Sequence, residues 1–473
     1  MKLGAIVQLL LLWPWAPCAA HGAGSPSPSE PILHPGETVE HVACAGDPEQ
    51  SYALHLPPGP APGPPRPLLI AMDPRGRAMI PIGLFKEAAE RHGWILVSSW
   101  NTLSDGPREA NERAMNAILP DVQIRVAVDS RRVYLAGFSG TARAAWNFAE
   151  RLQPHVAGIV GVGAGLPPGE EPARDQPFDF FGGAGEIDFN YEEVRALDVL
   201  LDRMELPHRV VFWPGEHGWP PAKVAGLAVD WLELRAMKRG LRPVDVEVVS
   251  ALYEGESRRA LELEQAGESY GAFRAWRSLA RDFEGLRDVT AAAEKAAALE
   301  ESRAVRSARR EADRTAERQR RYEVRFQAYL EDFAKWSIPP LERSLSRLEI
   351  PRLSTRASST GDSRDALAAK RLLEIVFVHC SFYEPQKYLA GGDPARALAL
   401  SLIAAEIKPD HPRIRLGLAR AYARLGRKEE AIRSLERLIE AIEVKRAFLA
   451  SDPDLVPLHD EPAFAAVLAR AAD

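Results

Sequence analysis

The chain has 473 residues, 46% of them hydrophobic, and a formal net charge of −6. This length exceeds what one ordinary hydrophobic core organises, so two or three domains are expected. The negative charge excludes the basic field that nucleic-acid-binding proteins use to neutralise phosphates. Three cysteines are too few for a disulfide scaffold. We therefore expect a multidomain globular protein that is stabilised by packed cores and does not bind nucleic acid.

The N-terminus has the composition of an export signal. A lysine precedes an apolar run over residues 3–15, and small residues then follow up to Ala23. Residues 1–23 are accordingly predicted to be a secretory signal peptide that is cleaved after Ala20 or Ala23. The protein is then expected to be exported, either to the periplasm or out of the cell.

Two alternatives for this segment are less favoured. A membrane anchor needs roughly 20 apolar residues, more than the run provides, and no other stretch predicts a transmembrane segment. Lipid attachment at Cys18 is disfavoured by Pro17 directly before it. Residues 24–48 are rich in Gly, Pro and Ser and are predicted to be an extended lead-in with little fixed structure.

Residues 49–240 alternate short apolar runs with segments of helical periodicity. The continuous apolar run at 68–72 is typical of a central strand that is buried on both faces. Further strands are expected at 51–56, 94–98, 132–138, 157–162, 178–181 and 209–213. This alternation predicts an α/β domain with a doubly wound, mostly parallel sheet.

The nucleophile candidate lies where one of these strands ends. Residues 132–141 read Arg-Val-Tyr-Leu-Ala-Gly-Phe-Ser-Gly-Thr and continue into a helical segment. A strand that breaks into a helix at Ser139 lifts the hydroxyl onto a sharp turn and directs the next N–H groups toward it. Such a serine needs a base within hydrogen-bond reach and a third group to orient that base.

Polar residues after two later strands supply these partners. Asp188 follows the strand at 178–181, and His217 follows the strand at 209–213. Polar groups in loops after parallel strands gather at one edge of a sheet. We therefore predict that Ser139 attacks, His217 transfers the proton and Asp188 orients the histidine, with Glu186 and Glu216 as alternatives for the acid.

The loop after the central strand is expected to complete the site. It begins with Asp73-Pro74, and proline has no N–H, so Arg75 or Gly76 is predicted to donate one oxyanion hydrogen bond beside Gly140. A plain charged turn is the alternative for this loop.

Three aromatic residues are candidates for the substrate pocket. Phe138 and Trp219 neighbour the serine and the histidine in sequence. Trp100 is expected either to line the acyl pocket or to cap the core, which is the commoner use of tryptophan. The histidines are scattered and form no metal-binding pattern, so neither a metal nor another cofactor is expected.

The Gly-Phe-Ser-Gly elbow, the Asp-Phe-Asn-Tyr segment that starts at Asp188 and the Gly-x-His-x-Trp-Pro-Pro segment around His217 resemble the α/β-hydrolase superfamily. The similarity is to the esterase branch related to polyhydroxybutyrate depolymerases and feruloyl esterases, and it covers residues 52–237. It implies cleavage of a small or polymeric carboxylic ester. Thr141 replaces the closing glycine of the motif, so a slightly opened elbow is expected. The short unit leaves little room for a large lid, so an open pocket is also expected.

Residues 241–473 are rich in Ala, Leu, Arg and Glu at helical spacing, which predicts an all-α domain. Helix pairs at 257–283 and 393–425 resemble tetratricopeptide repeats, whose period is about 34 residues. Such repeats bind a protein or peptide partner, and the alternative is a helical appendage that only steadies the enzyme. Residues 290–333 are expected to form a long exposed helix without a ligand site, and residues 353–363 a flexible connection.

Two functions from different classes follow. The first is an exported serine hydrolase of carboxylic esters, in which the helical domain serves for docking or dimerisation. The second is a catalytically weak or silent hydrolase-like protein that binds a partner, as the threonine of the elbow suggests. A serine peptidase with the same three residues stays open, because esters and amides share acyl transfer. A chain that ends after Gly240 is expected to remain soluble.

Overall fold

The computed structural model describes residues 33–60, 63–104, 106, 108–152, 155–167, 169–359 and 363–472. The predicted signal peptide, Cys18 and the first part of the predicted lead-in lie outside the described residues. None of the described helices is long and apolar enough to cross a membrane.

One eight-stranded sheet organises the N-terminal half, in the order β1-β2-β4-β3-β5-β6-β7-β8. Strand β2 runs antiparallel to β1 and β4, and all later neighbours are parallel. The strands are β1 (Thr38–Cys44), β2 (Asp47–His55), β3 (Arg66–Met72), β4 (Ile95–Ser99), β5 (Val128–Phe138), β6 (Val156–Val162), β7 (Asp179–Gly185) and β8 (His208–Trp213). The predicted mostly parallel sheet is confirmed.

Helices cover both faces of this sheet. On one face pack α2 (Arg108–Arg125), α3 (Gly140–Arg151) and α4 (Tyr191–Arg203). On the other face pack α1 (Met79–His92) and α5 (Ala222–Lys238). Because side chains alternate along a strand, each buried strand contributes to both layers. The domain is therefore doubly wound, as predicted.

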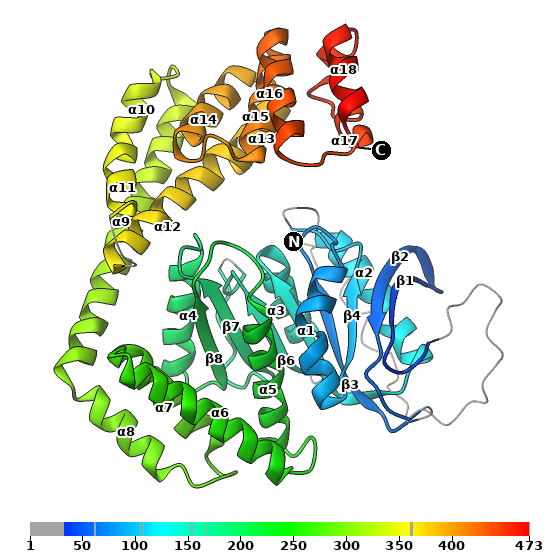
Figure 1. Ribbon diagram of the computed structural model, residues 1–473, viewed down its shortest axis with the longest axis vertical. Helices are drawn as coiled ribbons and strands as arrows, with labels where there is room; N and C mark the ends of the chain where they lie inside the picture. Colours follow the sequence, from blue (N-terminus) through cyan, green and yellow to red (C-terminus); the bar gives the residue numbers. More distant parts are fainter. Residues whose placement is uncertain are drawn as a thin grey trace, which may run out of the picture.

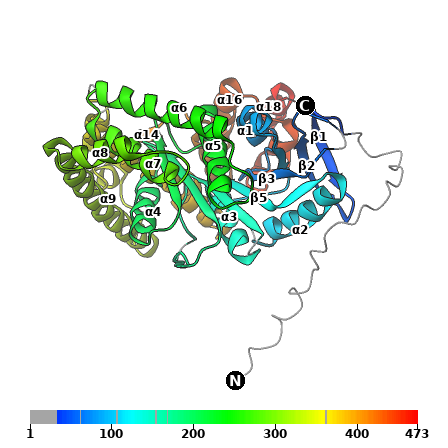
Figure 2. The same ribbon diagram turned by 90° about the horizontal axis from the view of Figure 1, so that it is seen from below.

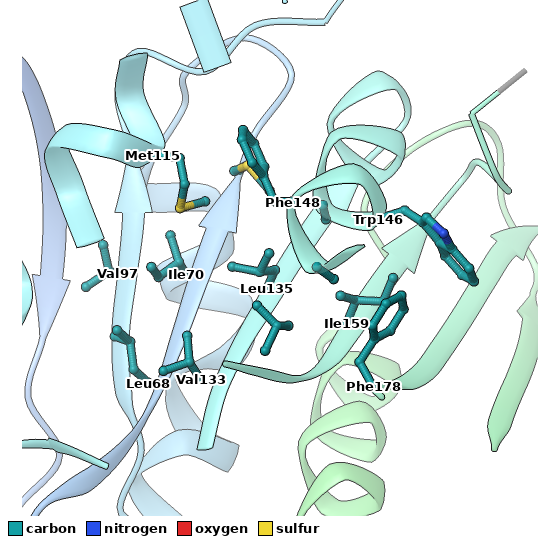
Figure 3. Packing of buried hydrophobic residues seen from close by; sticks show 14 of the residues in the cluster. Leu68, Ile70, Val97, Met115, Val133, Leu135, Trp146, Phe148, Ile159 and Phe178 are labelled. Atoms are coloured by element: carbon teal, nitrogen blue, oxygen red, sulfur yellow. The ribbon is translucent and has the colours of Figure 1, made fainter. Parts of the chain in front are cut away.

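The layer under α2 and α3 shows how this core is built (Figure 3). Leu68 and Ile70 of β3 lie beside Val133 and Leu135 of β5, and both pairs are almost fully buried. Met115 of α2 and Trp146 and Phe148 of α3 close the layer from above. Each such aliphatic side chain contributes about 1.5–3 kcal/mol on burial, so this layer fixes the strand from which the elbow emerges.

The predicted lead-in is wrong for residues 38–48, which form β1 and the start of β2. Strands β1 and β2 pair as a hairpin in which Val42 lies opposite Tyr52. Tyr52 is fully buried, and its hydroxyl donates to Asp121 Oδ2 at 2.6 Å. Val42 and Cys44 are the only buried residues of β1, so its apolar signal is too short to stand out from the polar residues around it.

The chain after Gly240 folds into helices across its described residues. They are α6 (Val246–Gln265), α7 (Ser269–Phe283), α8 (Thr290–Glu300), α9 (Arg303–Lys335), α10 (Leu341–Arg347), α11 (Ile350–Ala357), α12 (Arg364–Val378), the π-helical turn η1 (His379–Tyr383), α13 (Glu384–Ala390), α14 (Pro394–Ile407), α15 (Pro412–Arg424), α16 (Lys428–Ala441), α17 (Arg446–Ala450), the 3₁₀ turn η2 (Val456–Leu458) and α18 (Pro462–Arg470). The predicted helical character of this half is confirmed.

Two local predictions in this half need correction. The long helix expected at 290–333 is divided into α8 and α9, because Ser302 caps α9 by accepting a hydrogen bond from the N–H of Val305. Part of the flexible connection expected at 353–363 belongs to α11. By contrast, the expected start of a helix at Asp393-Pro394 is confirmed, since Asp393 accepts from the N–H of Arg396.

The helical half curves around the sheet domain (Figure 1). Helices α6–α8 lie along one side of it, α9 leads away from them, and α12–α18 lie across the top of the view. Seen from below, α14, α16 and α18 stand behind the sheet domain, which confirms that they extend over it (Figure 2). The helical half therefore approaches the sheet domain at two separate places.

Candidate active site

The turn between β5 and α3 holds Ser139 in a strained conformation. Its backbone has φ 57° and ψ −128°, a region that residues other than glycine rarely adopt. A Cβ atom on Gly137 would lie 2.2 Å from the carbonyl oxygen of Thr141, so only glycine permits so tight a turn. This is the geometry of a nucleophile elbow, with the serine raised at the end of a central strand.

Thr141 does not open the elbow, so that expectation is wrong. The side chain is fully buried. Its hydroxyl oxygen lies 3.0 Å from the N–H of Phe138, from which it accepts, and 2.6 Å from the carbonyl oxygen of Met72, to which it can donate. The threonine therefore satisfies buried backbone groups and ties the elbow to β3.

The loops after β5, β7 and β8 bring the three predicted polar residues together. His217 Nε2 lies 3.0 Å from Ser139 Oγ, and His217 Nδ1 lies 2.9 Å from both carboxylate oxygens of Asp188. Asp188 is fully buried and also accepts from the N–H of Asn190 at 2.8 Å. The histidine thus bridges a half-buried hydroxyl and a fully buried carboxylate, which is the arrangement that activates serine.

The alternative acids occupy other positions. The carboxylate of Glu216 faces Lys408 of the helical half at 3.2 Å. The backbone carbonyl of Glu186 accepts from the guanidinium of Arg371 at 2.8 Å. Asp188 is the carboxylate that pairs with the imidazole.

Aromatic rings hold the imidazole from two sides. The rings of Phe138 and Phe189 have centroids 4.6 Å and 4.2 Å from that of His217. Gly163 leaves room beside them, since a Cβ atom there would lie 3.1 Å from Asp188 Oδ2 and 3.2 Å from His217 Cε1. Sequence reasoning overlooked Phe189 and Gly163. The signal for the glycine was its place directly after β6.

The loop after β3 differs from the prediction. The N–H of Arg75 donates to Asp73 Oδ1 at 2.9 Å, and the N–H of Gly76 donates to the Asp73 carbonyl at 3.1 Å. Both predicted oxyanion donors are therefore engaged inside their own turn. Gly140 is the first residue of α3, where a helix leaves an N–H without an intrahelical acceptor. Its role as an oxyanion donor stays a prediction.

Asp73 acts as a hub between this loop and the histidine loop. It is fully buried and accepts from Trp219 Nε1 at 2.8 Å and from the guanidinium of Arg77. Burial alone would raise the pKa of this carboxyl, but the hydrogen bonds from Arg77 and Trp219 outweigh burial and hold the pKa below its usual value. Asp73 therefore stays ionised and anchors the loop that carries His217.

The three pocket candidates divide in the structure. Phe138 and Trp219 lie together beside the histidine, with ring centroids 5.8 Å apart. Trp100 packs against the core, and its indole N–H donates to the carbonyl of Glu40 in β1 at 2.8 Å. Trp100 thus caps the sheet edge, the commoner of its two expected roles.

Ser139 opens into a cavity of about 1070 Å³ whose far wall is helical. Helices α3 and α4 form the near wall with Arg143 and Glu193. Helix α9, the end of α12 and the turn η1 form the opposite wall, which includes Glu323, Phe326 and His379. Residues 290–333, which were expected to form an exposed helix without a ligand site, thus supply part of one wall of this cavity.

The walls of this cavity combine apolar side chains with charged ones that pair with one another. Arg143 pairs with Glu193 at 2.8 Å, and Arg195 pairs with Glu192 at 2.6 Å. Glu323 accepts from the amide of Gln319, and burial raises the pKa of its carboxyl. The walls therefore offer both charged and apolar contacts to a substrate. Among the residues that the structure describes, no group of three or more His, Cys, Asp or Glu side chains is arranged to hold a metal ion.

Residues 388–445 match the family model of the tetratricopeptide repeat, which confirms the repeat predicted in this region. The match spans the end of α13 through α16. Among curated proteins, the comparison found no sequence that matches this chain.

Several solved structures align with part of this chain. They include the fluorophosphonate-binding serine hydrolase FphF of Staphylococcus aureus (15% identity, TM-score 0.35, covering 42% of this chain and 99% of that one). S-formylglutathione hydrolase of the same organism aligns at 14% identity and TM-score 0.33 over 42% of this chain and 98% of that one. A feruloyl esterase module of Clostridium thermocellum aligns at 16% identity and TM-score 0.34 over 44% and 92%.

The strand order and the elbow are sufficient to assign the fold of the sheet domain. An eight-stranded sheet with one antiparallel strand near its edge, a strained serine after β5 and the chain order Ser139, Asp188, His217 are features of α/β-hydrolases. The chain therefore combines an α/β-hydrolase fold with a helical region that contains a tetratricopeptide repeat.

Proposed function

We propose that the protein is a serine hydrolase that cleaves carboxylic esters. One observation carries this proposal: His217 lies within hydrogen-bond distance of both Ser139, at 3.0 Å, and Asp188, at 2.9 Å. A strained elbow presents that serine to a cavity large enough for a substrate. Phe138 borders the histidine and Trp219 packs beside Phe138, and these two rings stay the proposed pocket residues.

In the first half of the reaction, Ser139 Oγ attacks the ester carbonyl while His217 Nε2 takes its proton. The N–H of Gly140 stabilises the oxyanion of the tetrahedral intermediate. The intermediate collapses, the alcohol leaves with the proton from His217, and the acyl group stays on Ser139. Asp188 keeps the imidazole in the correct tautomer and stabilises its protonated form.

In the second half, a water molecule attacks the acyl-serine ester while His217 accepts one of its protons. The new tetrahedral intermediate expels Ser139 Oγ, which regains the proton from His217. The products are the carboxylic acid and the regenerated serine. This cycle needs neither a metal nor another cofactor.

The location and the partner of the enzyme belong to the same proposal. The signal-peptide pattern of residues 1–23 supports export to the periplasm or the outside. The tetratricopeptide repeat at 388–445 supports docking of a protein or peptide. The alternative of a silent hydrolase-like protein was suggested by Thr141, whose buried hydrogen bonds remove that reason.

Labelling with a fluorophosphonate probe tests the proposal directly. Activated serines react with this probe, so the wild-type protein should be modified at Ser139, as identified by mass spectrometry of the labelled peptide. Ser139→Ala and His217→Ala should each abolish labelling and lower ester turnover by roughly 10⁴- to 10⁶-fold. Ser434→Ala, in the distal helix α16, is the matched control and should react like the wild type. Folded wild-type protein that neither reacts nor hydrolyses any ester of a broad panel would refute the proposal.

A further inference from the structure

Both loops that carry the histidine and its acid contact the helical half. The acid loop after β7 meets Arg371 of α12, and the histidine loop after β8 meets Lys408 at the end of α14. Neither contact is needed to complete the sheet or to cover its core. Their place at the two catalytic loops calls for another explanation.

Arg371 grips the acid loop on both sides of Asp188. The side chain is only 4% exposed, and its Nη1 donates to the carbonyl of Glu186 at 2.8 Å. The guanidinium also lies over the ring of Tyr191, 4.3 Å from its centroid, and 3.6 Å from the carboxylate of Glu192. These partners stand two residues before and three to four residues after Asp188. A shift of the loop would break the contacts on at least one side.

Lys408 makes a similar contact on the histidine loop. Its ammonium lies 3.2 Å from the carboxylate of Glu216, the residue directly before His217, and it also pairs with Glu374 of α12. Lys408 falls within the segment that matches the tetratricopeptide repeat. The repeat itself therefore touches the loop that holds the catalytic base.

Phe189 forms an apolar link between these two contacts. It packs against the core cluster of the helical half, and its ring lies 4.2 Å from that of His217. The helical core, the acid loop and the imidazole thus form one continuous packed path.

We propose that Arg371 is a positioning residue that holds the acid loop, so that the helical half is a working part of the catalytic centre. This inference rests on the proposed serine hydrolase. Asp188 must stay within hydrogen-bond distance of His217 Nδ1 throughout the reaction. Misplacement of a catalytic group by about 1 Å costs on the order of 100-fold in rate, so a fixed loop has kinetic value.

The charge balance around Arg371 argues against a purely stabilising role. Glu192 already pairs with Arg195 at 2.6 Å, so its charge is compensated without Arg371. Burial of a guanidinium is itself unfavourable, and Arg371→Met does not leave the neighbouring carboxylate of Glu192 without a cationic partner, because Glu192 keeps Arg195. Arg371→Met should therefore fold, while the carbonyl of Glu186 loses its donor and the acid loop its restraint.

The first test is kinetic and uses the full chain. With 4-nitrophenyl acetate, Arg371→Met should lower kcat roughly 10- to 100-fold and leave KM within about twofold, because the small ester does not need the loop for binding. Arg371→Lys retains one donor and should recover part of the loss. Arg420→Met is the matched control, because it removes a 2.7 Å pair with Asp452 inside the helical half and touches no catalytic loop. Unchanged kcat in folded Arg371→Met would overturn the proposal.

A second readout does not depend on turnover. The Nδ1 proton of a histidine bonded to a buried carboxylate gives a far-downfield proton NMR signal, and selective ¹⁵N-histidine labelling assigns it to His217. The signal should be sharp in the wild type and in Arg420→Met, and broadened or shifted in Arg371→Met. If the wild type fails every ester and probe assay, the proposed function falls, while this signal still tests the positioning of the loop. An identical signal in all three proteins would refute it.

If Arg371→Met does not fold, a substitution in the sheet domain takes its place in the test. Glu216→Gln removes the partner of Lys408 from the histidine loop, while Lys408 keeps Glu374. The same NMR signal should shift, by a smaller amount than in an Arg371 variant, since one of two contacts remains. No shift would count against the proposal.

Discussion

The helical half meets the sheet domain at two interfaces of different kinds. At the first, which we call the base, helices α6–α8 pack on α5. Leu234 and Met237 of α5 share one apolar cluster with Trp276 and Phe283 of α7. At the second, which we call the clamp, Arg371 of α12 and Lys408 at the end of α14 contact the loops that carry Asp188 and His217, and Phe189 of the acid loop packs against the helical core.

The two interfaces also use charge differently. In the base, Arg209 of β8 is 5% exposed and pairs with Glu256 of α6 and Asp282 of α7. In the clamp, Arg371 donates to the carbonyl of Glu186 and lies over the ring of Tyr191. The nearby carboxylate of Glu192 already pairs with Arg195. Breaking a compensated buried pair destabilises a fold, whereas removing a superfluous charge leaves it intact. The base should thus govern stability and the clamp catalysis.

Truncation gives the largest expected effect. A chain that ends after Gly240 loses the base, exposes Leu234 and Met237 and leaves Arg209 without its carboxylates. Each of the two apolar side chains loses about 1.5–3 kcal/mol of burial, so this fragment should aggregate or unfold non-cooperatively. This prediction differs from the soluble fragment that was expected from the sequence alone. A chain that ends after Ser302 keeps α6–α8 and should show a cooperative urea transition.

These two fragments also separate the interfaces functionally. The chain that ends after Ser302 lacks the clamp, so it should react with the fluorophosphonate probe more slowly than the full chain does. Equal stability of the two fragments would contradict the importance of the base. Equal labelling of the longer fragment and the full chain would contradict the importance of the clamp.

A single substitution in the base should have the next largest effect. Arg209→Met leaves Glu256 and the nearly fully buried Asp282 without the guanidinium between them. Loss of one partner from a buried ionic cluster costs about 3–5 kcal/mol, which urea unfolding of the full chain would measure. Arg427→Met, which breaks a surface pair with Glu430, is the control and should leave the unfolding midpoint unchanged. Similar midpoints for both variants would show that the base tolerates uncompensated charge.

The sequence was sufficient for the features that depend on local order. Ser139, Asp188 and His217 each follow a strand directly, and parallel strands deliver their following loops to one edge of the sheet. The order of the three residues along the chain is also informative, because the order serine, acid, histidine is typical of the α/β-hydrolase fold. Local capping at Asp393-Pro394 was likewise readable, since it involves only the next few residues.

The features that depend on contacts between residues far apart in the chain could not be predicted from the sequence. The carboxylate of Asp73 accepts a hydrogen bond from the N–H of Arg75. The order Asp-Pro-Arg-Gly does not predict this hydrogen bond. Helix α9 looks like a solvated helix because its charges alternate, yet its position after the base places Glu323 in the cavity of Ser139. Arg371 is separated from Glu186 by 185 residues and resembles any other helical arginine in sequence.

Lowering the pH gives the smallest expected effect that distinguishes the two interfaces. Asp198 of α4 lies 2.9 Å from the guanidinium of Arg274 and 3.3 Å from His208 Nε2. Burial alone would raise the pKa of Asp198, but Arg274, His208 and the more distant Arg277 outweigh burial and lower it. A carboxyl whose pKa is lower in the folded state contributes stability above its unfolded pKa, and loses that contribution as pH falls from there through the folded pKa.

The free energy of unfolding of the wild type should therefore exceed that of Asp198→Asn at pH 7, and the difference should shrink as pH falls below about 4, near the pKa of an unfolded aspartate. Urea unfolding at a series of pH values measures this difference directly. The bond from Arg371 to the Glu186 carbonyl has no titrating acceptor, so this contact of the clamp should not weaken over the range in which the pair in the base is lost. A difference between the two proteins that stays constant from pH 7 to pH 3 would mean that Asp198 is not held ionised by the arginine, and that this pair does not make the stability of the base depend on pH.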